Sequence, residues 1–533
     1  MFQICKNCSV QFDISPEDLE IYKKLEVPQP TFCMFCRMQR RMVFRNERSL
    51  YKSKCDFSGK DILSVYPPNS GWKVYEQKIW WSDQWDAMSY GRDFDFNKPF
   101  FEQFEDLIRE VPRINLQNRS NENSDYCNDT NDLKNSYLCF NSEQASNFYY
   151  CNTAGYGSDC MDLFWSMQVE LCYECTKVMG GYHSFWCFNC SNISDCYFCR
   201  DLIGCKNCFG CIGLRQKEYY IYNKLVGREV FENFLKSFDF SYSEIEKAKE
   251  KFAELCLIVP HRALEISNSE NSMGDYITNC KNCVDCFDIM ESENCRYIWD
   301  GVANNSYDCF NSGLESAFLY ECVGVYRGNN LKFCDKTSSS NDLQYCDYCY
   351  SCHDCFGCVC LNHKSYCILN KQYTKEEYFE LMPKIVEYMK KIGEYGEFFP
   401  VKLSPFGYND TVANWYAPLS RDEAINKGFK WNDYVAPKIS AVRDGMTTEI
   451  IECEGDGKLF KIIPQELQFY RKQKLPLPHF CPDCRHEKRK RQMNPRKLWD
   501  RKCGKCQVDI KTTYALGAPE IVYCEECYLK EIY

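Results

Sequence analysis

Histidine is scarce in this sequence, and the motifs of several common enzyme classes are missing. Only 6 of the 533 residues are histidine, and the chain has no HExxH sequence, no phosphate-binding loop and no dinucleotide fingerprint. Long hydrophobic runs are missing as well, because none approaches the ~20 apolar residues that a membrane-spanning helix needs. These absences argue against those enzymes and against a membrane protein, and they favour a non-enzymatic binding protein.

Signals for secretion are equally weak. The opening segment, MFQICKNCSVQFDISPEDLE, lacks the basic flank and the long apolar core of a signal peptide. We therefore expect a cytoplasmic protein in which the 40 cysteines are reduced thiols.

Proline is absent from residues 113–259 and 261–382, which suits continuous β-ladders because proline cannot donate a ladder hydrogen bond.

Positive charge is concentrated near the two ends of an acidic chain. The formal net charge is -10, yet residues 37–54 carry a net +6 and residues 485–505 a net +8, which leaves -24 for the rest. We therefore expect an acidic partner to contact the ends of the chain.

The two ends are copies of one module. Residues 12–41 align with residues 460–489 without a gap, at an offset of 448. The alignment predicts a duplication in which each copy began with two four-ligand metal sites. The matched residues include two cysteines and the arginine that follows them, which are Cys33, Cys36 and Arg37 in the first copy and Cys481, Cys484 and Arg485 in the second.

Two of these metal sites are intact. A CxxC pair places two thiolates on one tight turn, and two such pairs complete a tetrahedral four-sulfur shell without an open position, which suits structural zinc. Ordinary thiols or disulfides are the alternative. We predict two Zn²⁺ ions, held by Cys5, Cys8, Cys33 and Cys36 and by Cys503, Cys506, Cys524 and Cys527.

The other two sites have lost ligands. In the C-terminal copy, Asp456 replaces one thiol of a set that retains Cys453, Cys481 and Cys484. A carboxylate can bind zinc, but the glycines on either side suit Asp456 equally well to a turn, so a third and weaker zinc site is one of two expectations. The matching N-terminal site is lost, because its four positions are Cys55, Ser58, Glu76 and Ile79.

The first half of each module resembles small zinc-ribbon modules with the pattern CxxCGxxF…EQxFYxxxG…PxRCxxCR. The match covers about 40 residues at each end, although Ser9 stands where the pattern has glycine. The whole arrangement resembles uncharacterised cysteine-rich proteins of candidate-phylum bacteria, some of which carry a CaiB/BaiF CoA-transferase label that nothing in these residues supports. The resemblance implies zinc binding and no particular biological role.

A second duplication, at an offset of 147, occupies the middle of the chain. We call residues 120–226 the first repeat block and residues 267–373 the second. The sequence positions of all cysteines from Cys127 to Cys211 differ by multiples of three, and the pattern also repeats every twelve residues. In the second block, only Cys309 and Cys360 depart from this spacing of three. This pattern predicts a thin β-solenoid in which every third residue points inward and each coil contains twelve residues. The geometry is similar to that of insect antifreeze proteins, but the regular Thr-x-Thr face of ice binding is missing.

The repeat cysteines have three interpretations: a thiol-lined core, an iron–sulfur cluster, or extra metal, best supported at Cys346, Cys349, Cys352, Cys355 and Cys358. The core is favoured because every cysteine of the first block has the inward phase. An aromatic column beside the first block is either a packed stripe or a stacking platform for bases or peptides. Its members are Tyr137, Tyr149, Tyr173, Phe185, Tyr197 and Phe209.

The predicted fold is mainly β with short α-helices: two thin β-solenoid blocks with the twelve-residue coil, flanked by duplicated zinc-ribbon-like modules and capping helices. Helices are expected over 98–112, 243–256 and 374–391, the last two with capping boxes at Ser243–Glu246 and Thr374–Glu377. The segments are the N-terminal module 1–92, a helical connector 93–119, the first block 120–226, a helical connector 227–266, the second block 267–373, an irregular connector 374–440 and the C-terminal module 441–533.

Three non-enzymatic functions compete. The first is nucleic-acid binding, to RNA or DNA, through the basic runs that follow the CxxC pairs. The second is a scaffold that binds proteins on the solenoid faces, and the third is a thiol-rich store of metal or buffer against oxidants. The residues expected to contact phosphates are Arg37, Arg40, Arg41, Arg45 and Arg48, with Arg485, Lys488, Arg489, Lys490 and Arg491.

Overall fold

The computed structural model describes residues 1–68, 70–313, 315–434 and 450–532, which fall into two compact units. The first unit, Met1–Leu116 with Glu265–Tyr434, joins the N-terminal module to the second repeat block. The second unit, Gln117–Leu264 with Val435–Tyr533, joins the first repeat block to the C-terminal module. Each module thus belongs with the block that is farther from it in the sequence. The predicted boundary at 440/441 lies outside the described residues.

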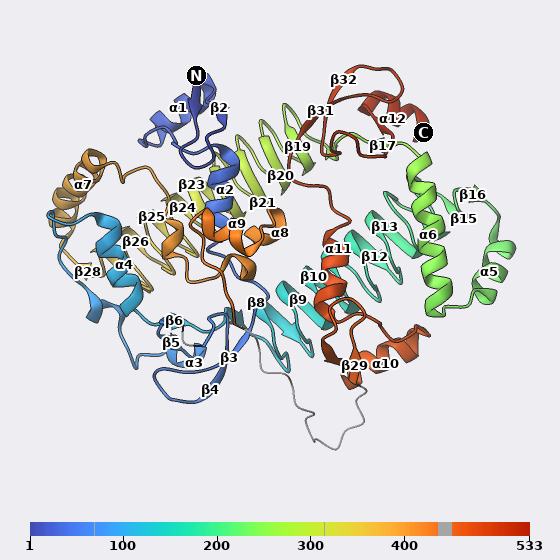
Figure 1. Cartoon of the computed structure of the whole chain (residues 1–533), viewed down its shortest axis with the longest axis horizontal. Coiled ribbons are helices and arrows are strands. Elements are labelled where there is room, and N and C mark those ends of the chain that lie inside the picture. Colours follow the sequence, from blue (N-terminus) through green and yellow to red (C-terminus); the bar gives the residue numbers. More distant parts are fainter. Residues whose placement is uncertain (69, 314, 435–449, 533) are drawn as a thin grey trace. The chain divides into compact units, whose positions relative to one another are not determined.

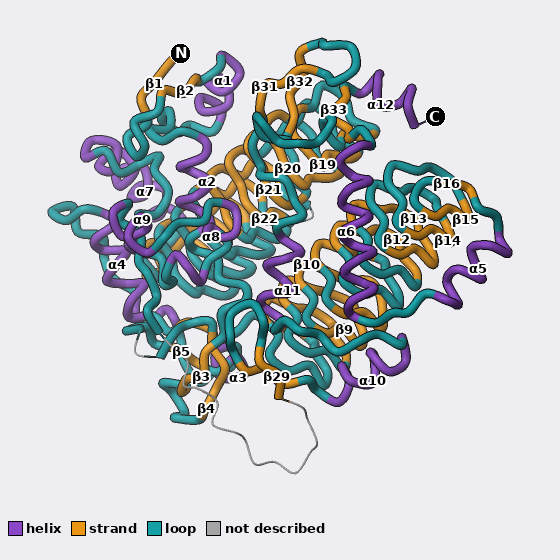
Figure 2. Tube along the Cα trace, turned by 45° about the vertical axis from the view of Figure 1, so that its right-hand side comes forward, coloured by secondary structure: helices purple, strands orange, loops and turns teal. Residues whose placement is uncertain are grey.

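Strands of the first repeat block pair in parallel at the predicted offset. Asn152 pairs with Phe164, and Thr176 with Phe188, in each case one full period of twelve along the chain. Figure 2 shows these strands as a continuous row. They form a 10-stranded sheet of β7 (Asn118–Arg119), β8 (Asn128–Lys134), β9 (Phe140–Tyr149), β10 (Asn152–Met161), β11 (Phe164–Met167), β12 (Thr176–Tyr182), β13 (Phe188–Tyr197), β14 (Lys206–Phe209), β15 (Glu218–Ile221) and β16 (Lys224–Leu225).

The second repeat block follows the same plan with less regular coils. Cys309 pairs with Ile298 on one side, where the coil is one position shorter than the period, and with Cys322 on the other, where it is one position longer. The short and the long spacing compensate, so Cys309 is buried in line with its paired residues although its position breaks the spacing of three. Cys360 instead occupies one of the positions with a positive φ. The sheet comprises β18 (Ile266–Ser267), β19 (Met273–Thr278), β20 (Val284–Met290), β21 (Arg296–Gly301), β22 (Tyr307–Ser312), β23 (Ala317–Val323), β24 (Asn329–Lys332), β25 (Asn341–Gln344), β26 (His353–Phe356), β27 (Ser365–Ile368) and β28 (Lys371–Gln372).

A left-handed backbone residue at almost every third position explains the period of three. Between Ser120 and Tyr222 these positions have a positive φ, whether they hold glycine or a residue such as Asn135 or Asp159. Asn and Asp tolerate this region better than most residues that carry a side chain. Four such positions fall within each twelve-residue repeat of the block.

Cysteine fills the interior of the first block. All 13 cysteines from Cys127 to Cys211 belong to one buried cluster, together with aliphatic side chains such as Leu163 and Ile193. Their thiols donate to nearby carbonyl oxygens, as in the 3.5 Å hydrogen bond from Cys187 to Phe185. All 40 cysteines of the chain are free thiols. These positions agree with the prediction of a thiol-lined core.

The aromatic column beside the first block is covered by helices. Its rings join one cluster with side chains of α5 (Arg228–Ser237), α6 (Tyr242–Ile258) and α10 (Pro464–Gln473). Figures 1 and 2 both show α6 running beside β12 and β13. The buried members of the column leave no open platform for bases, so the packed-stripe interpretation holds for Tyr149, Tyr173, Phe185, Tyr197 and Phe209.

Polar side chains close the ends of the coils. At the C-terminal end of each block an antiparallel hairpin follows, β15–β16 or β27–β28. The side-chain amide there bonds both to the N–H and to the carbonyl of the preceding coil, as Asn223 does with Ile212 and Asn370 with Val359. These amides satisfy backbone groups that would otherwise invite edge pairing.

The predicted helices are present as α4 (Phe100–Glu110), α6 and α7 (Lys375–Ile392). The capping box at Thr374–Glu377 is present, but the one at Ser243–Glu246 is wrong: α6 starts earlier, with Ser241 as its N-cap. None of the helices in the described part of the chain is long and apolar enough to cross a membrane. The irregular connector also holds α8 (Ala413–Tyr416) and α9 (Arg421–Asn426).

The two terminal modules repeat the order of hairpin, helix, helix and hairpin. The N-terminal module contains β1 (Phe2–Ile4), β2 (Gln11–Asp13), α1 (Pro16–Lys24), α2 (Met34–Met42), β3 (Tyr51–Lys54), β4 (Asp61–Ser64), β5 (Val74–Tyr75) and α3 (Gln77–Trp80), and its β5 pairs with β6 (Arg113–Ile114). The C-terminal module contains β29 (Ile450–Glu452), β30 (Leu459–Lys461), α10, α11 (Pro482–Lys490), β31 (Trp499–Lys502), β32 (Asp509–Thr512), β33 (Val522–Tyr523) and α12 (Glu525–Ile532), and its β33 pairs with β17 (His261–Arg262).

Candidate metal centres and their docking contacts

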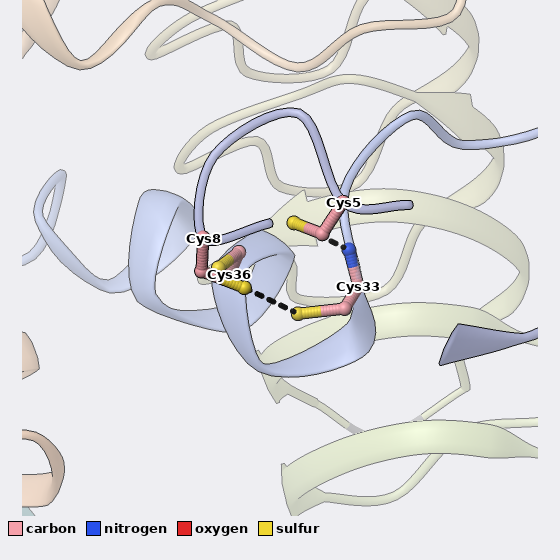
Figure 3. Close-up of side chains that lie close together, drawn as sticks. All are labelled: Cys5, Cys8, Cys33 and Cys36. Atoms are coloured by element: carbon pink, nitrogen blue, oxygen red, sulfur yellow. Dashed lines mark hydrogen bonds between the residues drawn. The ribbon is translucent and has the colours of Figure 1, made fainter. Parts of the chain in front are cut away.

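The first predicted cysteine set forms a compact cluster. Cys5 and Cys8 lie on the turn of the β1–β2 hairpin, Cys33 is the N-cap of α2, and Cys36 lies in its first turn. The four sulfur atoms lie within 4.8 Å of one another, and the Sγ atoms of Cys8 and Cys33 are 3.7 Å apart. A zinc ion with ~2.3 Å bonds to four sulfurs needs a spacing of ~3.8 Å. Figure 3 shows the four side chains gathered at this point, which could hold a metal ion.

Hydrogen bonds within this cluster favour the thiolate at Cys33 but the protonated thiol at Cys36, whose pKa the Cys33 side chain raises. A hydrogen bond from Cys36 lowers the pKa of Cys33 to about 5. The backbone N–H of Cys33 donates to the sulfur of Cys5 at 3.2 Å. Thiolates are the form that binds metal, so the donor set fits a soft or borderline cation.

The C-terminal four-cysteine set has the same geometry. Cys503 and Cys506 lie on the turn between β31 and β32, and Cys524 precedes α12, which contains Cys527. The sulfurs of Cys506 and Cys524 are 3.7 Å apart. Burial raises the pKa of Cys503, but backbone N–H groups, among them those of Cys506 and Cys524, outweigh it and lower the pKa to about 6.

The third set also comes together. Cys453, Asp456, Cys481 and Cys484 offer one ligand atom each within 4.8 Å of the others, so Asp456 lies at the site as well as on the hairpin turn. Its carboxylate oxygens are 3.8 and 3.9 Å from the sulfur of Cys481. This group could hold a third metal ion.

The remaining cysteines form no comparable group. Among the residues that the structure describes, the three sets of at least three close ligand atoms all lie in the terminal modules. The run from Cys346 to Cys358 is therefore not such a set, although its thiols are buried. At the fourth module site, Cys55 accepts a hydrogen bond from the backbone of Glu76 at 3.3 Å and belongs to no metal-binding group.

Helix α2 carries arginines directly from the cluster onto the second repeat block. Arg37 follows the ligand Cys36 and forms a two-pronged ion pair with Asp308, with both contacts at 3.0 Å. Arg41, one turn later, reaches Asp308 at 3.2 Å and Glu321 at 2.7 Å. Arg40 completes a neutral group of three guanidinium groups and three carboxylates by contacting Glu321 and Glu397. Figure 1 shows α2 lying across the strands of this block near β23.

Helix α11 makes the equivalent contacts with the first repeat block. Arg485 follows Cys484 and lies 2.8 Å from a carboxylate oxygen of Asp162, and Arg489 lies 2.9 Å from the other oxygen. Asp162 is completely buried. Glu466 of α10 also contacts Arg485, at 3.3 Å.

The contacts of α2 and α11 with their repeat blocks match at their central residues. The guanidinium of Arg37 lies over the ring of Tyr297, and that of Arg485 lies over Tyr150. The hydroxyl groups of these tyrosines bond to equivalent acidic residues of the modules, Asp18 and Glu466. The aromatic partners are related by the offset of 147, and the buried carboxylates Asp308 and Asp162 by 146. Sequence reasoning missed these partners, although the block offset of 147 relates Tyr150 to Tyr297 and falls one position from the relation between the two aspartates.

This geometry corrects part of the prediction that the arginines and lysines of the two basic runs contact phosphates. Arg37, Arg40, Arg41 and Arg45, with Arg485 and Arg489, are buried, and each forms an ion pair within its own unit. A buried guanidinium that is already paired with a carboxylate cannot neutralise a phosphate. Of the other predicted contacts, Arg48 and Lys490 are half-buried, and Lys488 and Arg491 are exposed.

Comparison with known proteins adds little. No family model and no curated protein matches the chain. One solved structure with some similarity is described as a "putative acetyltransferase" from Desulfovibrio desulfuricans G20. The match has 11% identity, covers 45% of this chain and 63% of that chain, and has a TM-score of 0.10. A score this low carries no argument about fold or activity.

Proposed function

We propose that this protein is a zinc-binding, non-enzymatic scaffold in which zinc-ribbon-like modules fasten onto two thin β-solenoids. Parallel pairing at the period of twelve and a left-handed corner at almost every third residue support the solenoid interpretation. The sulfur spacing of 3.7 Å in both four-cysteine sets supports zinc, which would tie each hairpin to the helix or strand end that supplies its other ligands.

The observation that carries this proposal is that an arginine of each docking helix comes directly after a metal-ligand cysteine in the sequence. Cys36 is followed by Arg37 and Cys484 by Arg485, and each arginine is paired with a buried carboxylate of a repeat block. An ion at the cysteines would fix where the helix begins and so place its arginines. The basic runs would therefore serve internal docking, which favours a scaffold over a nucleic-acid-binding protein.

A pair of matched cysteine variants tests the proposal. Cys33→Ser should remove one zinc ion from the purified protein and make residues 1–92 sensitive to proteases, while the second repeat block stays folded, because a structural site supplies folding energy locally. Cys55→Ser, in the degenerate site of the same module, should change neither the zinc content nor the digestion pattern. Equal behaviour of the two variants would contradict a zinc-held module.

Nucleic-acid binding is the alternative outcome. Wild-type protein should show no micromolar affinity for mixed RNA or DNA at low salt. Tight binding that weakens steeply with salt, and that Lys488→Ser with Arg491→Ser removes, would replace the scaffold function by phosphate recognition through the exposed end of α11.

A further inference from the structure

The third ligand set differs from the two four-cysteine sets in one position, and the difference weakens it. Asp456 occupies the place of Cys8 in the duplicated module, and its side chain also forms an ion pair with the exposed Lys458 at 3.1 Å. A zinc ion bound to one thiolate and one carboxylate needs a sulfur-to-oxygen spacing of ~3.5 Å, which is shorter than the 3.8 and 3.9 Å found here. Binding would thus have to shift the carboxylate towards Cys481 while Lys458 holds it by the ion pair.

The same set lies at the start of the helix that docks onto the first repeat block. Cys481 is the N-cap of α11, and its sulfur accepts the backbone N–H of Cys484. The backbone N–H of Cys481 donates to the sulfur of Cys453 at 3.2 Å, so the hairpin and the helix meet at this point. Arg485 and Arg489 then reach the buried Asp162 from the same helix.

We propose that Cys453, Asp456, Cys481 and Cys484 form an exchangeable zinc site whose occupancy controls the docking of α11 onto the first repeat block. The inference rests on the proposed zinc-binding function and adds a regulatory role for one of the sites. With the ion bound, its positive charge holds three thiolates and a carboxylate together. Without it the hairpin and the helix lose the bonds that they share through the ion, the start of α11 loosens, and Arg485 and Arg489 leave Asp162 to water.

The N-terminal module supplies the reference within the same chain. Its α2 makes the equivalent contacts with Asp308, but its site has four cysteine ligands, and Val10 stands at the position equivalent to Lys458. Since thiolates bind zinc more tightly than carboxylates do, α2 should stay docked at zinc concentrations at which α11 is released. Loss of zinc would therefore release α11 from the first repeat block while α2 stays docked on the second.

The test is a graded chelation of the full-length protein that contains three zinc ions, followed by elemental analysis and hydrogen exchange. Chelators of increasing affinity should first remove one of three ions, and amide exchange over residues 482–490 should then rise at least about tenfold while exchange over residues 34–42 stays unchanged. Asp456→Cys should retain three ions and lose this early response. Cys8→Asp should transfer the early response to α2.

The outcomes separate this inference from the proposed function. A protein that holds two zinc ions even with excess zinc, or that loses the third without faster exchange in α11, would overturn the switch and leave structural zinc intact. A protein that holds no zinc at all would overturn both. Early release that Asp456→Cys does not suppress would show that the carboxylate ligand is not the cause.

Discussion

The guanidinium of Arg37 and the carboxylate of Asp308 form a two-pronged ion pair although both side chains are almost completely shielded from water, at 3% and 0% exposure. A carboxylate oxygen of Asp308 also forms an ion pair with the guanidinium of Arg41, at 3.2 Å. Such a group is stable only as a whole, because removing one partner leaves an uncompensated buried charge.

Asp308→Ala should therefore release α2 from the second repeat block. The expected cost is about 3–5 kcal/mol in the opening free energy of α2, measured by native-state hydrogen exchange, because two buried guanidinium groups lose a partner. Asp61→Asn is the control: Asp61 pairs with Lys54 at 3.9 Å on the surface and should cost less than about 1 kcal/mol. Similar costs for both variants would contradict the buried dock.

The sequence predicted the parts of this structure that depend on local periodicity. The cysteine phase predicted the coil length, and the CxxC pairs predicted which sulfurs meet. It could not predict the dock, because Arg37 and Asp308 are separated by 271 residues and an aspartate at a corner position looks like any other turn residue. The assignment of each module to the more distant block was hidden for the same reason. Cys309 shows a further limit of the periodicity argument. A strict period of three excludes it from the interior, but one spacing of eleven residues and one of thirteen bring it back into line with Ile298 and Cys322.

A thiol in the coil interior should behave as a small buried apolar group. Cys187→Ala should cost only ~1–2 kcal/mol of stability in the first block, measured by urea denaturation. Ile193→Asp should be far worse, because the new carboxylate would enter the cysteine-lined core without a partner. A harmless Ile193→Asp beside a Cys187→Ala variant that fails to fold would show that inward and outward positions were exchanged.

The second block should become less stable as the pH rises. Burial raises the pKa of Asp335 from its ordinary 3.8 to about 8, despite the opposing charges of Lys336 and Arg113. The folded state thus keeps a proton that the unfolded state releases, so the stabilising contribution is full below about pH 4 and is lost as the pH rises towards 8.

This pH dependence can be measured by hydrogen exchange in β24 and β25 between pH 5 and pH 8, after correction for intrinsic exchange rates. Asp335→Asn should remove on the order of 1–3 kcal/mol of the pH-dependent loss. Asp342→Asn, on the exposed surface of β25, should leave the wild-type profile unchanged. A wild-type profile in the Asp335→Asn variant would contradict burial of a protonated carboxyl.

The polar first coil of the second block should protect it from edge pairing. Ser269 and Ser272 accept the backbone N–H groups of Cys280 and Cys283, at 3.0 and 3.2 Å, beside the terminal strand β18. Replacing both serines by valine should expose an apolar coil end and promote association. Light scattering should then detect oligomers that wild-type protein lacks; an unchanged molar mass would speak against this role.

The central claim is that zinc at the module cysteines organises this protein, and the most direct measurement is elemental analysis of purified full-length chain beside a count of reactive thiols. Purified protein should hold two zinc ions that survive dialysis against a weak chelator and a third that is lost first. It should show 40 reactive thiols when it is denatured in strong chelator without a reductant. Protein without zinc, with iron in its place, or with its module cysteines oxidised to disulfides would contradict it.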